Sequence, residues 1–138
     1  MTRTILRHWR LLTVVTVAQC VIAAVLRVVS IAKVRAGAQA CRPLACRLVP
    51  ASDDRIAWAL EATGRRLGGA SSCLGRALLA QMLLSRGDAP VSVCLGVKHP
   101  AGGALQAHAW AVRGDRILVG APAHEYLPML TWTAVDAR

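Results

Sequence analysis

Cys73 and His108 are the two residues whose types and placement in the sequence could perform covalent chemistry. Cys73 follows Ser72, a residue type favoured at helix N-caps, so it falls in the first turn of a helix predicted over residues 72–87. The dipole and free N–H groups of a helix start favour the thiolate, which is the nucleophilic form of cysteine. A histidine within hydrogen-bond reach could take the thiol proton and later protonate a leaving amine. The alternative is a buried, inert cysteine and a strand histidine with an ordinary polar partner.

The hydropathy pattern predicts the elements that must position this pair, with helices first and strands after them. Helices are expected over residues 11–32, 52–68 and 72–87, and strands over residues 91–97, 107–113 and 116–119 and near 130–135. Residues 35–51 contain Gly37, Pro43 and Pro50 and are predicted to be a linker. This order is typical of an α+β fold. We divide the single expected domain into an N-terminal helical segment with its linker, residues 1–50, and a core, residues 51–138.

Charge and apolar residues concentrate at the N-terminus. The chain is 55% hydrophobic with a formal charge of +10, and residues 1–50 carry eight Lys and Arg and no Asp or Glu. Such a block suits an acidic partner or an anionic membrane surface, and no nucleic-acid-binding motif accompanies it. Only sixteen residues separate Arg10 from Arg27, whereas a membrane span needs about twenty. A narrow polar stripe on this helix favours packing against protein, with membrane contact second and secretion third.

The five cysteines indicate a reducing compartment. Their number is odd and their spacing is irregular, which is atypical of a disulfide framework and suits the cytoplasm. Cys41 and Cys46 lack a second ligand pair at zinc-site spacing, so no metal is expected. Cys94 lies within a predicted strand, away from any helix start, and is expected in the core.

Four short motifs in order suggest a family. They are SCLGRAL at residues 72–78, LSRG at 84–87, LGV at 95–97 and AHAW at 107–110. Together they resemble the transglutaminase-like cysteine peptidases that mature lasso peptides, specifically the stand-alone peptidase half of the split maturation protease. The resemblance covers residues 52–120 and is weaker over the N-terminal helices.

This resemblance implies a papain/transglutaminase-like fold and removal of the leader peptide from a ribosomally made precursor, without a cofactor. It also implies two partners besides the precursor: a separate leader-recognition protein and the lasso cyclase. The chain has no extra length for a leader-binding domain of its own, which fits the split form.

The resemblance implies Cys73 as nucleophile, His108 as base and then acid, and an aspartate about twelve residues after the histidine. Position 120 is glycine instead. Asp115 falls at the tip of the predicted hairpin, roughly 20 Å from His108 at ~3.3 Å per residue. Glu125, beside His124, is nearer in register but follows Pro122. A Cys–His dyad with an unidentified orienting group is therefore expected.

Two further residues are candidates for substrate binding. Arg76, one helical turn after Cys73, could hold an acidic group of the substrate or a neighbouring carboxylate. Trp110 shares the strand face of His108 and could shield the imidazole from water, or be an ordinary core tryptophan. Two other functions share these features: a non-catalytic scaffold that presents the precursor, and an acyltransferase of the same fold.

Overall fold

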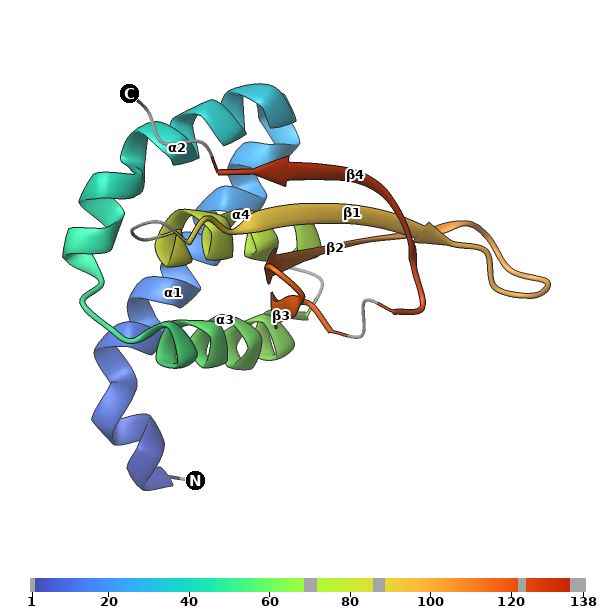
Figure 1. Ribbon diagram of the computed structural model, residues 1–138. Coiled ribbons are helices and arrows are strands. Elements are labelled where there is room, and N and C mark those ends of the chain that lie inside the picture. Colours follow the sequence, from blue (N-terminus) through green and yellow to red (C-terminus); the bar gives the residue numbers. More distant parts are fainter. Residues whose placement is uncertain (1, 69–71, 86–88, 122–123, 135–138) are drawn as a thin grey trace.

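The computed structural model describes residues 2–68, 72–85, 89–121 and 124–134, and these form four helices and a four-stranded antiparallel sheet (Figure 1). The helices come first in the chain and the strands follow, which confirms the predicted α+β fold. In chain order the elements are α1 (Thr2–Val28), α2 (Ile31–Leu48), α3 (Asp53–Leu67), α4 (Cys73–Leu84), β1 (Ser92–Lys98), β2 (Gln106–Arg113), β3 (Arg116–Val119) and β4 (Leu127–Thr133).

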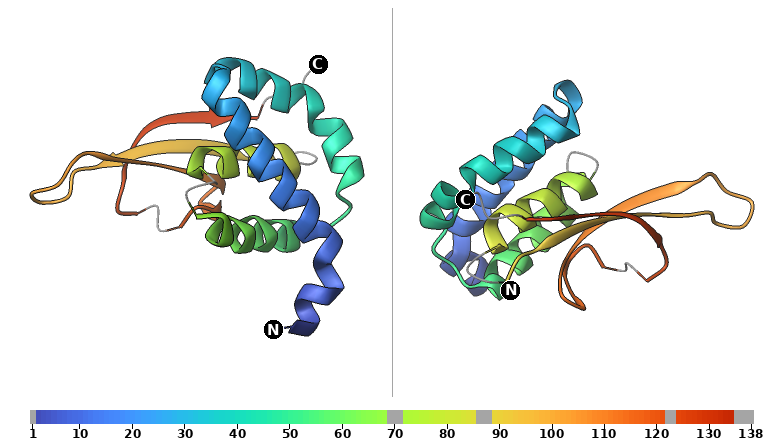
Figure 2. Two further views of the ribbon diagram at one scale, coloured as in Figure 1. Left: turned by 180° about the vertical axis from the view of Figure 1, so that it is seen from behind. Right: turned by 45° about the horizontal axis from the view of Figure 1, so that its top comes forward.

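The sheet packs one face on α4, and the other helices surround α4. The strand order is β3-β2-β1-β4, and the long β1–β2 hairpin extends away from the helices (Figures 1 and 2). On β2, Ala109 and Ala111 are buried in the same cluster as Ala77 and Ala80 of α4. These small side chains let strand and helix approach closely. The helices and the sheet therefore share one core at this contact.

Helix α4 begins as the sequence predicted. The Ser72 hydroxyl accepts a hydrogen bond from the Gly75 N–H at 2.9 Å, so Ser72 is the N-cap and Cys73 is the first helical residue. Ser52 likewise precedes α3, although its side chain makes no capping bond there. At the other end of α3, Gly68 adopts a φ of 53° and terminates the helix. Gly87, the predicted end of α4, lies outside the described residues.

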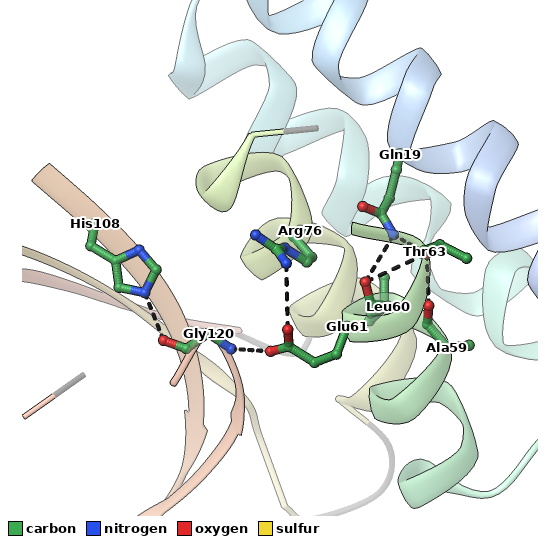
Figure 3. A network of polar contacts seen from close by, with 8 residues as sticks. All are labelled: Gln19, Ala59, Leu60, Glu61, Thr63, Arg76, His108 and Gly120. Atoms are coloured by element: carbon green, nitrogen blue, oxygen red, sulfur yellow. Dashed lines mark hydrogen bonds and ion pairs between the residues drawn. The ribbon is translucent and has the colours of Figure 1, made fainter. Parts of the chain in front are cut away.

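Helix α1 turns a polar residue inward. The Gln19 amide is buried and donates to the Leu60 carbonyl at 3.1 Å and to Thr63 Oγ1 at 2.6 Å, which ties α1 to α3 (Figure 3). Val15 lies in the same core cluster as α3 and α4. In the view from behind, α1 lies on the side of the molecule away from the sheet (Figure 2). By length and composition alone, His8–Val28 would suffice to cross a membrane, with a mean hydropathy of 2.2 and 17% of the apolar window buried.

The predicted linker over residues 35–51 is wrong, because helix α2 occupies most of it and contains Pro43. A proline inside a helix removes one backbone hydrogen bond and costs about 3 kcal/mol. Tertiary packing on α4 compensates: Val34 is buried in the common core, and the Cys46 thiol lies 3.7 Å from the Met82 carbonyl. The glycine and proline signals were therefore overridden by contacts distant in sequence.

Gln81 joins α4 to the start of β1 and the end of β4, which lie side by side, and its loss should measurably destabilise the protein. Its buried amide donates to the carbonyls of Val91 at 2.9 Å and Trp132 at 2.8 Å. Gln81→Leu leaves these acceptors unsatisfied, so we expect a loss of about 1–3 kcal/mol in urea unfolding. Gln106→Leu, at an exposed position of β2, is the matched control and should change stability by less than about 0.5 kcal/mol. Equal effects of the two substitutions would contradict this role of Gln81.

Candidate active site

Cys73 occupies the first helical position of α4, and its side chain is half-buried against the core. The first N–H groups of a helix have no partner within the helix, and they point toward any negative charge at its start. Ser72 uses one of these donors, that of Gly75, and leaves the N–H of Cys73 outside the cap. This placement suits a thiolate nucleophile.

His108 lies in β2, and its ring is oriented by the main chain. His108 Nε2 lies 2.6 Å from the carbonyl oxygen of Gly120, just beyond β3 (Figure 3). A carbonyl oxygen only accepts hydrogen bonds, so Nε2 carries the proton and donates it. In the neutral ring Nδ1 is then unprotonated and can act as a base. The orienting group that the sequence left unidentified is thus a backbone carbonyl.

Two aromatic side chains flank the imidazole. The Trp110 ring stacks near His108 with centroids 6.0 Å apart and planes at 23°, and the Tyr126 centroid lies 4.9 Å away. Trp110 is buried with Cys94, as predicted for that cysteine. Gly96, opposite His108 in β1, makes room for this arrangement, because a Cβ there would lie 2.7 Å from the indole ring. The aromatic side chains restrict the movement of the histidine and its access to water.

Cys73 and His108 lie at the same end of the packed helix and strand. At the other end, Arg113 of β2 donates to the Leu84 carbonyl of α4. Measured from that contact, His108 lies five residues earlier in β2, a rise of about 16 Å at ~3.3 Å per residue. Cys73 lies eleven residues earlier in α4, which is also a rise of about 16 Å at ~1.5 Å per residue. Side chains alternate between the two faces of a strand, so the His108 side chain lies on the same face of β2 as Trp110. Ala109, which packs on α4, lies on the other face. No hydrogen bond links Cys73 to His108 in the described part of the chain.

Arg76 contacts Glu61 of α3, a residue that the sequence analysis missed. Arg76 Nη1 lies 3.4 Å from Glu61 Oε2, and Glu61 Oε1 accepts the Gly120 N–H at 2.6 Å (Figure 3). Glu61 therefore contacts the residue that orients His108. Its position within α3 gives no sequence signal, because the contact depends on how α3 packs beside β3.

The two acidic candidates for the third catalytic position lie elsewhere. Asp115 is exposed in the β2–β3 turn. Glu125 is exposed beside the equally exposed His124 and accepts a hydrogen bond from Lys98 Nζ at 2.7 Å. This bond holds the pKa of Glu125 below its ordinary value and raises that of Lys98. Neither carboxylate is hydrogen-bonded to His108 within the described ranges.

Gly120 is required by its backbone conformation and by its neighbours. Its φ of 98° is disfavoured for other residues, and a Cβ would lie 2.8 Å from Trp110 Cβ and 2.9 Å from Trp110 Cα. An aspartate at this position would collide with β2. The conformation that presents the carbonyl to His108 therefore excludes the acidic side chain expected from the sequence resemblance.

Sequence comparison identifies one family. The model of the transglutaminase-like superfamily matches residues 12–131, which is 120 of the 138 residues and includes α4, β1 to β3 and most of α1 and β4. Neither the curated proteins nor the solved structures provide a match. Among the described residues, no cluster of three or more His, Cys, Asp or Glu could hold a metal ion.

Substitution of Gly120 should be more damaging than that of another glycine with positive φ. Gly114→Ala places a Cβ in open space at a φ of 58° and should cost about 1–2 kcal/mol. Gly120→Ala adds contacts with the β2 backbone, so we expect about 1–3 kcal/mol more. Thermal and urea unfolding of the two variants measure the difference. An equal loss, or a stabilised Gly120→Asp protein, would show that residue 120 has more room than the structure gives it.

Proposed function

The chain belongs to the transglutaminase-like superfamily, and from this premise we propose that it is a cysteine peptidase that removes the leader peptide from a lasso peptide precursor. The superfamily is compatible with peptidase or acyl-transfer activity. The observation that carries the proposal is the position of Cys73 at the start of α4, level with a histidine whose Nε2 is already occupied. The lasso assignment is supported by the four motifs within residues 72–110.

The proposed reaction uses one thiol and one imidazole. Nδ1 of His108 takes the Cys73 proton, and the thiolate attacks the carbonyl carbon of the scissile peptide bond. The Cys73 N–H is placed to donate to the oxyanion of the tetrahedral intermediate. The imidazolium then protonates the leaving amine as the C–N bond breaks, which leaves a thioester. His108 next deprotonates a water molecule that hydrolyses the thioester, releases the carboxylate and restores the thiol.

A non-catalytic scaffold that presents the precursor to another enzyme is the second candidate. It is favoured by the missing hydrogen bond between Cys73 and His108 among the described residues, and by glycine at position 120. The peptidase reaction requires the His108 side chain to turn toward α4 when substrate binds, because the structure places it on the opposite side of β2 from Ala109. An acyltransferase would share the same thioester and differ only in passing it to an amine, so product analysis distinguishes transfer from hydrolysis.

The nucleophile is tested by Cys73→Ala. We expect this variant to lose precursor cleavage almost completely, at least about 1000-fold, because none of the other four cysteines lies at the start of a helix. Cys94→Ala, which removes the buried thiol of β1 that packs with Trp110 and lies at no helix start, should retain most of the activity. Mass spectrometry of the precursor and of its products measures both, and trapping of a thioester distinguishes a peptidase from a scaffold. Cleavage at the wild-type rate by the Cys73→Ala protein would exclude the proposal.

We further propose that the leader-recognition protein docks on α1 of this chain, in the cytoplasm. Four valines, Val14, Val17, Val21 and Val28, are 48–83% exposed along α1 at helical spacing. Exposed Arg10 precedes this row, and exposed Arg27 lies next to its last member, Val28. An outward apolar row of this length suits a protein partner, and its basic ends suit an acidic leader or recognition protein. The five free thiols are consistent with a reducing compartment. The lasso cyclase would act on the released core peptide.

Docking predicts that the recognition protein accelerates cleavage. When the recognition protein holds the precursor and docks on the peptidase, the local concentration of the precursor rises, to roughly millimolar for a short tether. Val21→Glu should remove most of this acceleration, whereas Met129→Glu on β4, an apolar position that is also exposed, should not. The comparison is precursor cleavage with and without the recognition protein at matched peptidase concentration.

A salt titration separates the two kinds of contact. Attraction through arginine weakens as the Debye length falls from about 10 Å at 0.1 M to about 3 Å at 1 M, whereas apolar docking persists. Equal rates with and without the partner, together with sedimentation of the protein with anionic vesicles, would instead assign this surface to a membrane.

A further inference from the structure

A chain of hydrogen bonds runs from helix α3 to the imidazole of His108. Glu61 Oε1 accepts the Gly120 N–H at 2.6 Å, and the Gly120 carbonyl accepts the His108 Nε2–H at 2.6 Å (Figure 3). The two bonds use opposite ends of one residue. Glu61 is therefore connected to the histidine through the backbone of Gly120.

Gly120 needs such an anchor because the sheet does not hold it. The pairing of β3 with β2 ends at Val119, opposite Ala111, so Gly120 lies just past the ladder. Glycine has the greatest backbone freedom of all residues, and Gly120 uses it at a φ of 98°. The direction of its carbonyl is thus not set by strand geometry. The bond to Glu61 fixes the N–H end of this residue.

Glu61 is itself held in place on its second oxygen. Arg76 Nη1 lies 3.4 Å from Glu61 Oε2, and the Arg76 side chain crosses Gly64, where a Cβ would lie 2.5 Å from the same nitrogen. Both side chains are mostly covered, with Arg76 18% and Glu61 29% exposed. Water and salt therefore screen this pair less than a pair on the open surface. Both carboxylate oxygens are engaged, so Glu61 is preorganised to accept from Gly120.

We propose that Glu61 is a positioning residue for the peptidase reaction, which anchors Gly120 so that its carbonyl keeps His108 in the Nε2–H form with Nδ1 free to act as the base. When the Cys73 proton moves from Sγ to Nδ1, the other proton stays on Nε2 and remains hydrogen-bonded to the Gly120 carbonyl. Helix α3 thus contributes to the site without contacting the substrate. The kinetic consequence rests on the proposed function, but the tautomer of His108 does not.

The direct test is ¹⁵N NMR of the full chain with labelled histidine, because ring nitrogen shifts report the tautomer. The signals of the four histidines are assigned by comparison with His108→Ala. We expect wild-type His108 in the Nε2–H form and Glu61→Ala with a mixture of both tautomers. Asp54→Ala is the matched control, since it removes another carboxylate of α3 that pairs with β3, through Arg116. It should leave the His108 signals unchanged.

The cleavage kinetics of these variants should differ in the same way as the tautomers of His108. In Glu61→Ala we expect kcat for precursor cleavage to fall about tenfold or more, with KM nearly unchanged, because a misoriented base slows the proton transfers and leaves substrate binding intact. Glu61→Gln keeps an oxygen that can accept from Gly120, so it should retain the wild-type tautomer and most of kcat. Asp54→Ala should behave as wild type.

Three results would overturn the inference: a wild-type tautomer and kcat in Glu61→Ala, a Gln variant as impaired as the Ala variant, or an Asp54→Ala protein with the same tautomer mixture. If Glu61→Ala does not fold, Glu61→Asp serves instead, since its shorter side chain draws the carboxylate away from Gly120 and should produce part of the mixture. A tautomer that responds as expected in a protein without peptidase activity would refute the proposed function and support the positioning role.

Discussion

The hydrogen bond between His108 Nε2 and the Gly120 carbonyl is the contact on which the site depends. It fixes which nitrogen of the ring is protonated and leaves the other nitrogen unprotonated in the neutral imidazole. Three features of the surrounding structure support it: the turn that returns β3 beside β2, the glycine at position 120 and the carboxylate of Glu61. Each acts on the position of one carbonyl oxygen.

The packing of α4 on β2 sets the other half of the site. Alanines on both sides of the contact, Ala77 and Ala80 on the helix and Ala109 and Ala111 on the strand, let the two elements lie close together over their length. Because the rise per residue of a strand is about twice that of a helix, eleven residues of α4 span about the same length as five residues of β2. The start of the helix and the histidine thus reach the same level through packing alone, although they are 35 residues apart in the sequence.

The sequence was informative where a signal is local and uninformative where the contact is distant. Ser72 predicted the start of α4, and the alternation around Ala107–Arg113 predicted β2 nearly to its ends. Pro43 suggested a linker because proline disfavours a helix interior. The packing of α2 on α4, which stabilises the helix, has no local signal in the sequence. Glu61 and the Gly120 carbonyl were missed for a similar reason. The first depends on how α3 packs beside β3, and the second belongs to the backbone, which no residue type encodes.

An acceptor supplied by the main chain has a consequence for how such proteins are surveyed. Every amino acid carries a carbonyl, so a side-chain scan of the chain deletes many groups but never this one. A survey that ranks sequences by whether a carboxylate follows the histidine at the expected distance would also discard this chain as degenerate. Its histidine nevertheless has a hydrogen-bond acceptor at 2.6 Å. For chains of this kind, a survey therefore has to include the backbone groups around the imidazole as well as the side chains.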